Sequence, residues 1–257
     1  YKAIEKYVSE NIDENGRLDE KRATDNAKLV LVLSALDKDV TDVGGHDLLN
    51  ALSDMDYVTQ QGLSGAIYAL LAFDCRGYDI PSADKNVEQT SREGLVKYIL
   101  DKQLKDGGWA YSGDKAEPDM TAMALQALAA YYKTDAKVKE AADKAVTCLS
   151  KLQNTTGGYD SYGSVNSESA AQVITALTAI GIDPDNDARF VKNGVSVLDS
   201  LCGFYVDGGG FRHVSDGKLD PTATAQGYYA LAAYYRFADS QTALYDMTDL
   251  DAIEKAA

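Results

Sequence analysis

The stretch QLKDGGWAYSGDKAEPDMTAMALQALAAYY (residues 103–132) contains, in order, a glycine pair, an aromatic residue, a polar loop and an alanine-rich run. The same order returns in QNTTGGYDSYGSVNSESAAQVITALTAIG (153–181) and in DGGGFRHVSDGKLDPTATAQGYYALAAYYR (207–236). Aligning the glycine pairs gives a period of about fifty residues, which is typical of a fold built from repeated units. The three copies extend over residues 86–133, 136–181 and 187–237.

The hydrophobic pattern predicts two kinds of helix. One kind has a single apolar stripe opposite a charged side and should face water. We expect it over residues 1–12, 137–152 and 187–202. The other kind is apolar nearly all round and should be buried on all sides. We expect it over residues 27–36, 62–73, 121–132, 170–180 and 224–235. Their alternation predicts an inner layer of helices surrounded by an outer layer.

The expected fold class is therefore all-α, with residues 1–257 forming a single domain. The pattern indicates about eleven helices, in outer–inner pairs followed by a C-terminal segment over 240–256. No run alternates with the period of a strand, so no significant β-sheet is expected. The layers could close into a ring or form an open solenoid. A closed ring would place a further inner helix before Tyr1.

Composition excludes several classes of protein. The hydrophobic share is 45% and the charged share 25%, which is ordinary for a soluble globular chain. Twenty-five basic against forty acidic residues give a net charge of −15, which disfavours nucleic acid and anionic lipid as partners. No apolar run is long enough for insertion into a membrane. Three cysteines cannot all pair within one chain, which excludes a disulfide scaffold.

The glycine-aromatic segments carry a family resemblance. Gln103 to Trp109 matches the Q-x(2–5)-G-x-W core of the repeat in triterpene cyclases, and Gln153 to Tyr159 matches with tyrosine in place of tryptophan. The third copy keeps the glycines and Phe211. The chain thus resembles the terpenoid cyclase/protein prenyltransferase superfamily. It is most similar to the prenyltransferase and squalene oxidase repeat domains of Gram-positive surface proteins.

That resemblance implies an α/α toroid, a location outside the cell or anchored at its surface, and flanking domains in a longer protein. Transcobalamin and intrinsic factor share the toroid and bind a corrinoid without chemistry. The architecture therefore does not fix an activity.

The repeat residues have a structural interpretation. Each glycine pair lets the chain turn sharply through backbone angles that other residues avoid. Gln103 and Gln153 can then hydrogen-bond nearby backbone. Three aromatics, Trp109, Tyr159 and Phe211, are expected to wedge between neighbouring hairpins, with contact to a ligand as the alternative.

The acids at the helix starts are the candidates for catalysis. Cyclases that protonate an alkene need D-x-D-D-T-A, whereas the copies here read E-P-D-M-T-A, N-S-E-S-A-A and D-P-T-A-T-A. Asp119 occupies the place of the proton donor and is the one catalytic candidate. In the alternative interpretation Glu117 and Asp220 are N-caps before a proline, and Asp119 and Glu168 complement the helix dipole. The dipole favours an ionised carboxylate, not a proton donor.

The sequence lacks the residues that other reactions of this kind require. A zinc prenyltransferase needs a histidine where Ala223 stands, and the chain has only His46 and His213, so we expect no metal and no cofactor. The Gly-Cys-Gly-Glu-Gln of thioester domains is missing. The alternating acids of 183–187 could form a calcium loop, but a turn followed by an N-cap explains them as well.

The loops 109–120, 159–169 and 211–223 should converge on one rim, where we expect a ligand pocket. Candidate ligand-binding residues are Glu117, Asp119, Glu168, Asp220, Trp109, Tyr159, Phe211, Arg212 and His213. The predicted function is a non-catalytic, extracellular binding module. Its partner would be a small molecule, hydrophobic or corrinoid, or a cell-surface glycan or protein. A terpene cyclase-like lyase or isomerase is one alternative, and a carbohydrate-active enzyme with paired carboxylates is another.

Overall fold

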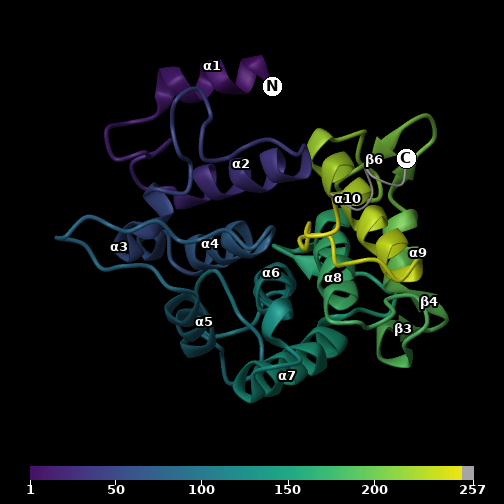
Figure 1. Ribbon diagram of the computed structural model, residues 1–257. Helices are drawn as coiled ribbons and strands as arrows, with labels where there is room; N and C mark the ends of the chain where they lie inside the picture. The colour runs from purple at the N-terminus through teal and green to yellow at the C-terminus, as the bar shows by residue number, and fades with distance from the viewer. Residues whose placement is uncertain (251–257) are drawn as a thin grey trace. The chain divides into compact units, whose positions relative to one another are not determined.

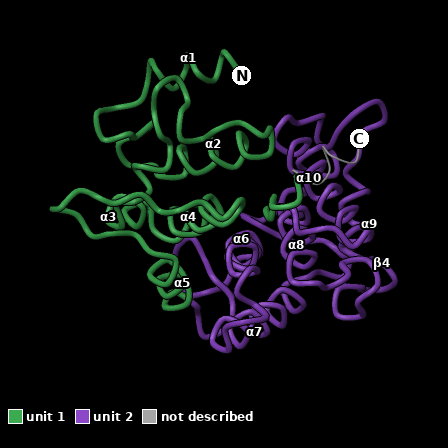
Figure 2. Tube along the Cα trace, viewed as in Figure 1, with its two compact units in different colours: residues 1–102, 245–257 green, residues 103–244 purple. Residues whose placement is uncertain are grey.

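The computed structural model describes residues 1–250 and is mainly helical in that range, with α-helices and three short two-stranded hairpins (Figure 1). The expectation of an all-α fold is confirmed at this level. Contacts along the chain define two compact units, as Figure 2 shows. Unit 1 comprises residues 1–102 with the segment from Tyr245 onward, and unit 2 comprises residues 103–244.

Unit 1 is built around two helices whose facing sides are buried. Its elements are α1 (Lys2–Asn11), α2 (Ala23–Ala35), η1 (Ala51–Ser53), α3 (Met55–Gln60), α4 (Leu63–Asp74) and α5 (Arg92–Asp101). Helix α2 packs against α4, and α4 also packs against α3 and α5. Their facing side chains, including Val30, Leu33, Ile67 and Leu70, are fully buried. The helices predicted over 1–12, 27–36 and 62–73 are confirmed as α1, α2 and α4. The expected burial of 27–36 on all sides is wrong, because Val32 and Leu36 are 49% and 54% exposed.

Unit 2 contains the three copies of the glycine-aromatic segment. Its helices are α6 (Pro118–Leu128), η2 (Ala129–Tyr131), α7 (Ala136–Leu152), α8 (Ser167–Ala179), η3 (Ala188–Phe190), α9 (Val197–Cys202) and α10 (Pro221–Ala238). Its strands are β1 (Asp160–Ser161), β2 (Ser164–Val165), β3 (Val191–Lys192), β4 (Val195–Ser196), β5 (Tyr205–Val206) and β6 (Gly210–Phe211), paired antiparallel in chain order. Helix α8 contacts both α6 and α10, while α7 packs on α6 and α9 on α8 (Figure 1).

Buried amides connect the three central helices of unit 2. Gln126 on α6 donates its Nε2–H to Oε1 of Gln172 on α8, at 2.9 Å. Gln172 in turn donates to the hydroxyl of Tyr229 on α10, at 2.6 Å. Because a buried amide without partners is costly, these bonds specify which helices lie next to one another.

The helix predicted over 187–202 is wrong in its first two thirds. Only α9 at its end is α-helical; residues 188–196 form η3 and the β3–β4 hairpin. The cause is the turn at Asn193 and Gly194, which have φ of 52° and 82°. Asn-Gly favours such hairpin turns, and helical periodicity does not detect them. Ser196 then starts α9 with a capping box that it forms with Asp199.

Helix α10 differs from the expectation of burial on all sides. Its Ala223, Gly227, Ala230 and Ala233 are buried, but Tyr228 and Tyr235 are 48% and 66% exposed. Helices α6 and α8 are each covered by a following helix, α7 or α9. Within residues 1–250, no helix after α10 covers it in the same way.

The C-terminal helix predicted over 240–256 is also wrong where the structure describes it. Residues 240–249 form turns and irregular chain. Asp246 holds a turn by accepting the N–H of Thr248, and Met247 donates its N–H to the Cys75 carbonyl at 2.7 Å. These bonds take the place of helical ones. Residues 251–256 lie outside the part of the chain described.

Candidate functional site

The glycine pairs of the repeat make two different contributions. Gly107 and Gly157, the first of their pairs, have φ of 93° and 80°, which glycine adopts without strain. A Cβ on Gly157 would also lie 2.8 Å from the Ser196 carbonyl oxygen. The second glycine permits close packing, because a Cβ on Gly108 would lie 2.5 Å from Oγ1 of Thr121. The predicted sharp turn is confirmed.

The repeat aromatics lie inside the unit and not at its surface. Trp109, Tyr159 and Phe211 are 0%, 0% and 1% exposed. Thr121 accepts the Trp109 N–H at 2.9 Å, and Thr224 accepts the Phe211 N–H at 3.0 Å. These bonds join each loop to the helix that follows it. In this conformation the three rings offer no surface to a ligand.

The repeat glutamines bind backbone, as predicted. Gln103 donates to the carbonyls of Gly107 and Ala141, both at 2.8 Å. Gln153 donates to Gly157 at 2.9 Å and to Phe190 at 2.8 Å. Each glutamine therefore ties its own glycine turn to a distant segment. Tyr205 stands at this position in the third copy.

Two candidate acids connect one copy of the repeat to the next. Asp119 accepts a hydrogen bond from the Ser161 hydroxyl at 2.8 Å. Glu168 lies 2.8 Å from Nδ1 of His213. Ser161 and His213 each stand two residues after the aromatic of the following copy. The acids thus join each helix start to the next loop, a role that was not predicted although the register of the copies contains it.

The predicted N-caps have different outcomes. Asp220 caps α10 by accepting the Ala223 N–H at 2.8 Å, as expected. Glu117 occupies the N-cap position before Pro118, but its side chain makes no capping bond. Its longer side chain suits the position less well than aspartate. Arg212, another candidate, donates to the Gly203 carbonyl at 3.1 Å within its own loop.

Two exposed tyrosines that sequence reasoning missed stand in the loops 109–120 and 159–169. Tyr162 is 87% exposed and Tyr111 is 70% exposed. The Glu117 carboxylate raises the pKa of the Tyr162 hydroxyl, with further contributions from burial, Asp119 and Tyr111. The sequence contains no signal for these two residues, because tyrosines in loops follow no periodic pattern.

Within residues 1–250, the thiols and the remaining acids show no arrangement for nucleophilic or metal chemistry. The three cysteines are free, and burial raises the pKa of each thiol, that of Cys148 to about 11. Thiolate is therefore scarce near neutral pH. Asp187 caps η3 and pairs with Arg189, in agreement with a turn and cap at 183–187. Within residues 1–250, no three histidine, cysteine or acidic residues are grouped to hold a metal ion.

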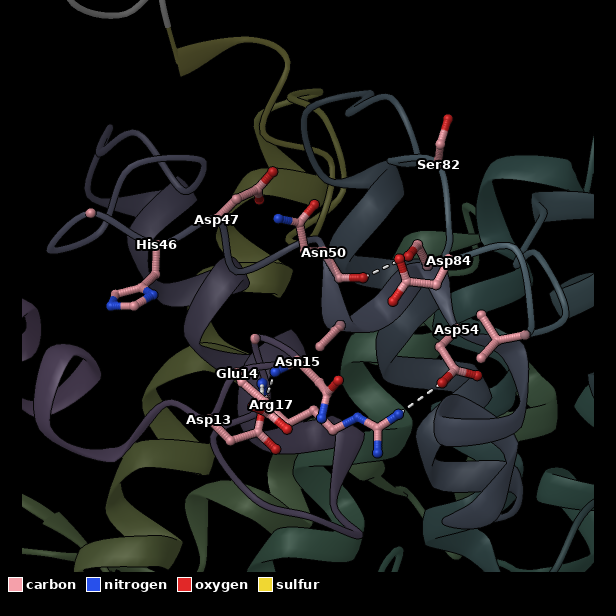
Figure 3. Close-up of a pocket in the computed structure, with 15 residues that line it drawn as sticks. Asp13, Glu14, Asn15, Arg17, His46, Asp47, Asn50, Asp54, Ser82 and Asp84 are labelled. Carbon is pink, nitrogen blue, oxygen red and sulfur yellow. Dashed lines mark hydrogen bonds and ion pairs between the residues drawn. The ribbon is translucent and has the colours of Figure 1, made fainter.

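Unit 1 contains a polar cavity of about 500 Å³ that the sequence did not indicate (Figure 3). Its walls come from three loops, within residues 13–17, 45–54 and 82–87. Five carboxylates and one guanidinium are among the lining groups. The charged and polar side chains are Asp13, Glu14, Asn15, Arg17, His46, Asp47, Asn50, Ser53, Asp54, Ser82 and Asp84.

One wall of the cavity is fixed by an ion pair. The guanidinium of Arg17 lies 2.8 Å from Oδ2 of Asp54 and 4.2 Å from the centre of the Tyr57 ring. Asp54 also accepts the Tyr57 N–H at the start of α3. Asp13 holds its own loop by accepting the N–H groups of Asn15 and Arg17. These bonds occupy one carboxylate oxygen of Asp13, both of Asp54 and one terminal nitrogen of Arg17, whereas Nε of Arg17 is buried without a partner.

Other side chains of the lining are available to a ligand. Glu14, Asn15, His46, Asn50 and Asp84 make no side-chain hydrogen bond or ion pair within residues 1–250. Figure 3 shows them around the same space. Asp47 has a raised pKa because it is partly buried, although its bond to the Leu49 N–H opposes this. The cavity therefore offers mostly hydrogen-bond acceptors.

Neither a protein-family model nor a curated protein matches this sequence. Among the helices described, none has the length and apolar character needed to cross a membrane.

Proposed function

We propose that this chain is a non-catalytic binding module that takes a small polar molecule into the cavity of unit 1. The observation that carries the proposal is a space of about 500 Å³ whose polar lining includes five side chains, those of Glu14, Asn15, His46, Asn50 and Asp84, without a hydrogen bond or ion pair within residues 1–250. Small-molecule sites typically measure about 300–1,000 Å³ and fix their ligands with a few such groups. The Arg17–Asp54 pair gives the site a preorganised wall.

The lining favours a ligand that donates hydrogen bonds. Five carboxylates face one guanidinium, which is already paired with Asp54. Hydroxyl and amine groups would satisfy these acceptors, whereas a phosphate would be repelled. A surface glycan would meet them with its hydroxyls, and a corrinoid with its amides. A wholly hydrophobic molecule would leave them unsatisfied.

The proposed setting is an α/α toroid in an extracellular or surface-anchored protein. The internal repeats support it, as does the packing of α7 on α6 and of α9 on α8. The resemblance to repeat domains of Gram-positive surface proteins supplies the location and the expectation of flanking domains.

The surroundings of Asp119 support binding over cyclase-type catalysis. Its Oδ2 accepts a hydrogen bond from Ser161, and its Oδ1 is buried without a partner. Ser161 ties this acid to the next copy, a structural use that requires no substrate. A binding role for the chain is consistent with this structural use of Asp119.

Ligand capture with a blocked cavity tests the proposal. Immobilised wild-type protein, Asn50→Trp and Gln60→Trp are exposed to a metabolite extract, and the retained molecules are identified by mass spectrometry. Asn50 lines the cavity, whereas Gln60 is an exposed residue of α3 outside it. We expect a molecule that wild type and Gln60→Trp retain unchanged and Asn50→Trp loses. Equal retention by all three, or conversion of the molecule, would contradict the proposal.

A further inference from the structure

The charges that line the cavity of unit 1 do not balance. Its carboxylates belong to Asp13, Glu14, Asp47, Asp54 and Asp84. The guanidinium of Arg17 is paired with Asp54 at 2.8 Å. Among the described residues, His46 is the only other lining group that can carry a positive charge. Even a protonated imidazole would leave the lining strongly negative.

Several carboxylate oxygens of the lining have no partner. Asp13 uses Oδ1 for N–H groups of its own loop, and Asp47 uses Oδ1 for the Leu49 N–H at 2.8 Å. Within residues 1–250, no hydrogen bond or ion pair reaches the Oδ2 atoms of these two residues or either oxygen of Glu14 and Asp84. Figure 3 shows these four side chains around one space. The cavity therefore concentrates negative charge that the fold does not neutralise.

The nearest basic residue in the sequence does not neutralise this charge. Lys85 follows Asp84, but it is exposed, does not line the cavity and forms no ion pair within residues 1–250. In agreement, the pKa of Asp47 is raised, mainly by burial and further by the charge of Asp39, although its bond to a backbone N–H opposes this. A cation brought by the ligand would relieve the repulsion among these carboxylates.

The rest of the lining selects the kind of cation. No tryptophan, tyrosine or phenylalanine is among the lining residues described, so the cavity lacks the aromatic faces that attract quaternary ammonium. Apolar side chains are limited there to Ala51 and Val87. Asn15, Asn50 and Ser82 instead offer amide and hydroxyl groups that no side-chain hydrogen bond occupies within residues 1–250. These groups suit a primary ammonium, with its three N–H donors, on a molecule that also carries hydroxyls.

We propose that the ligand of the unit 1 cavity is an amino sugar with a free amine. The unpaired carboxylates bind the protonated amine, and Asn15, Asn50 and Ser82 bind the ring hydroxyls. The inference rests on the proposed function of this cavity and narrows its ligand to a cationic class. A volume of about 500 Å³ is within the range of sites that hold small molecules.

Three disaccharides with one skeleton separate charge from shape. The β-1,4-linked disaccharide of glucosamine carries free amines, cellobiose carries hydroxyls in their place, and N,N′-diacetylchitobiose carries neutral amides. Each is titrated into the wild-type protein and followed by calorimetry. We expect the glucosamine disaccharide to bind at least about tenfold more tightly than the other two, and its affinity to fall as salt is added. Equal affinities, no binding of the glucosamine disaccharide, or binding that salt leaves unchanged would overturn the proposal.

Variants place the charge recognition in the cavity. Glu14→Gln and Asp84→Asn each remove one charge with little change of shape, and neither side chain holds the fold by a hydrogen bond, so both should fold. Each should weaken binding of the glucosamine disaccharide about three- to fivefold. Glu20→Gln, at an exposed acid of unit 1 that does not line the cavity, is the matched control and should bind as wild type. Unchanged binding in Glu14→Gln and Asp84→Asn, or an equal loss in the control, would refute the assignment.

The same measurements separate this inference from the proposed function. Suppose that cellobiose binds as tightly as the glucosamine disaccharide and that Asn50→Trp no longer binds it. This result would refute the selection of a cation and leave the cavity as the binding site. Capture from the extract of a neutral molecule that depends on Asn50, without binding of the glucosamine disaccharide, would have the same meaning. If no molecule depends on Asn50, the proposed function fails as well.

Discussion

Two neighbouring turns of the second repeat copy use the left-handed region of the backbone in opposite ways. At the first turn Gly157 has φ of 80°, and Tyr159 just after it is fully buried. At the second turn Tyr162 itself has φ of 53°, and its side chain is 87% exposed. Packing dictates the residues of the first turn. It does not dictate the tyrosine of the second, whose side chain lies outside the core.

The same contrast extends through the copies. Glycines, glutamines and buried aromatics form a frame that ties each loop to its helices. Side chains at the tips of the loops take no part in these bonds. Function in repeat folds commonly depends on such positions, because they can vary without cost to the frame.

Gly157→Ala should have the largest effect. The new Cβ would lie 2.8 Å from the Ser196 carbonyl and 2.9 Å from a Val195 methyl, at a positive φ. We expect a loss of about 3 kcal/mol in the free energy of unfolding, measured with urea. Gly163→Ala, with φ of 87° and open space around it, should lose only about 1 kcal/mol. Equal losses would show that close packing does not distinguish the two turns.

Gln153→Ala should have the second-largest effect on stability. It removes the donor that serves the carbonyls of Gly157 and Phe190 inside unit 2. Leaving these buried acceptors without partners should cost about 2 kcal/mol in urea unfolding. Gln60→Ala, at an exposed position of α3, serves as control and should change stability by less than about 0.5 kcal/mol. A loss no greater than that of the control would show that Gln153 does not stabilise the frame.

Tyr162→Asn should act in the opposite direction. Asparagine tolerates the left-handed region better than tyrosine, so unfolding free energy should rise by about 1 kcal/mol. The reciprocal change, Asn193→Tyr, places a tyrosine in the β3–β4 turn. It should lower the free energy of unfolding by a similar amount. Loss of stability in Tyr162→Asn would mean that the exposed ring supports the fold.

Asp119→Asn should have the smallest effect. Its oxygen can still accept the Ser161 hydroxyl, so the expected loss is below about 1 kcal/mol. A double-mutant cycle with Ser161→Ala measures the coupling between the two side chains. Absence of coupling would contradict the link between copies that the 2.8 Å bond indicates.

Much of the helical fold could be predicted from sequence because burial leaves a periodic pattern. The long amphipathic stripe of α7 and the apolar runs of α2, α4, α6 and α8 appear where expected. The β3–β4 hairpin was missed although Asn193–Gly194 signals it, since apolar residues around it also fit a helical stripe. The exposed face of α10 was missed because its tyrosines count as apolar.

The candidate sites were harder to predict. The acids at the helix starts could be found from the aligned copies, but their partners Ser161 and His213 became evident only in three dimensions. The cavity of unit 1 draws its walls from loops that are up to about seventy residues apart and share no motif. Such a site depends on tertiary folding and leaves no local pattern.

Urea unfolding of Gly157→Ala and Tyr162→Asn, measured side by side, tests most directly the claim that the frame and the loop tips of the repeat serve different ends. Both variants are unfolded beside wild type under the same conditions. We predict that Tyr162→Asn unfolds at a higher urea concentration than wild type and that Gly157→Ala unfolds at a lower one. Losses of similar size in the two variants would contradict the account.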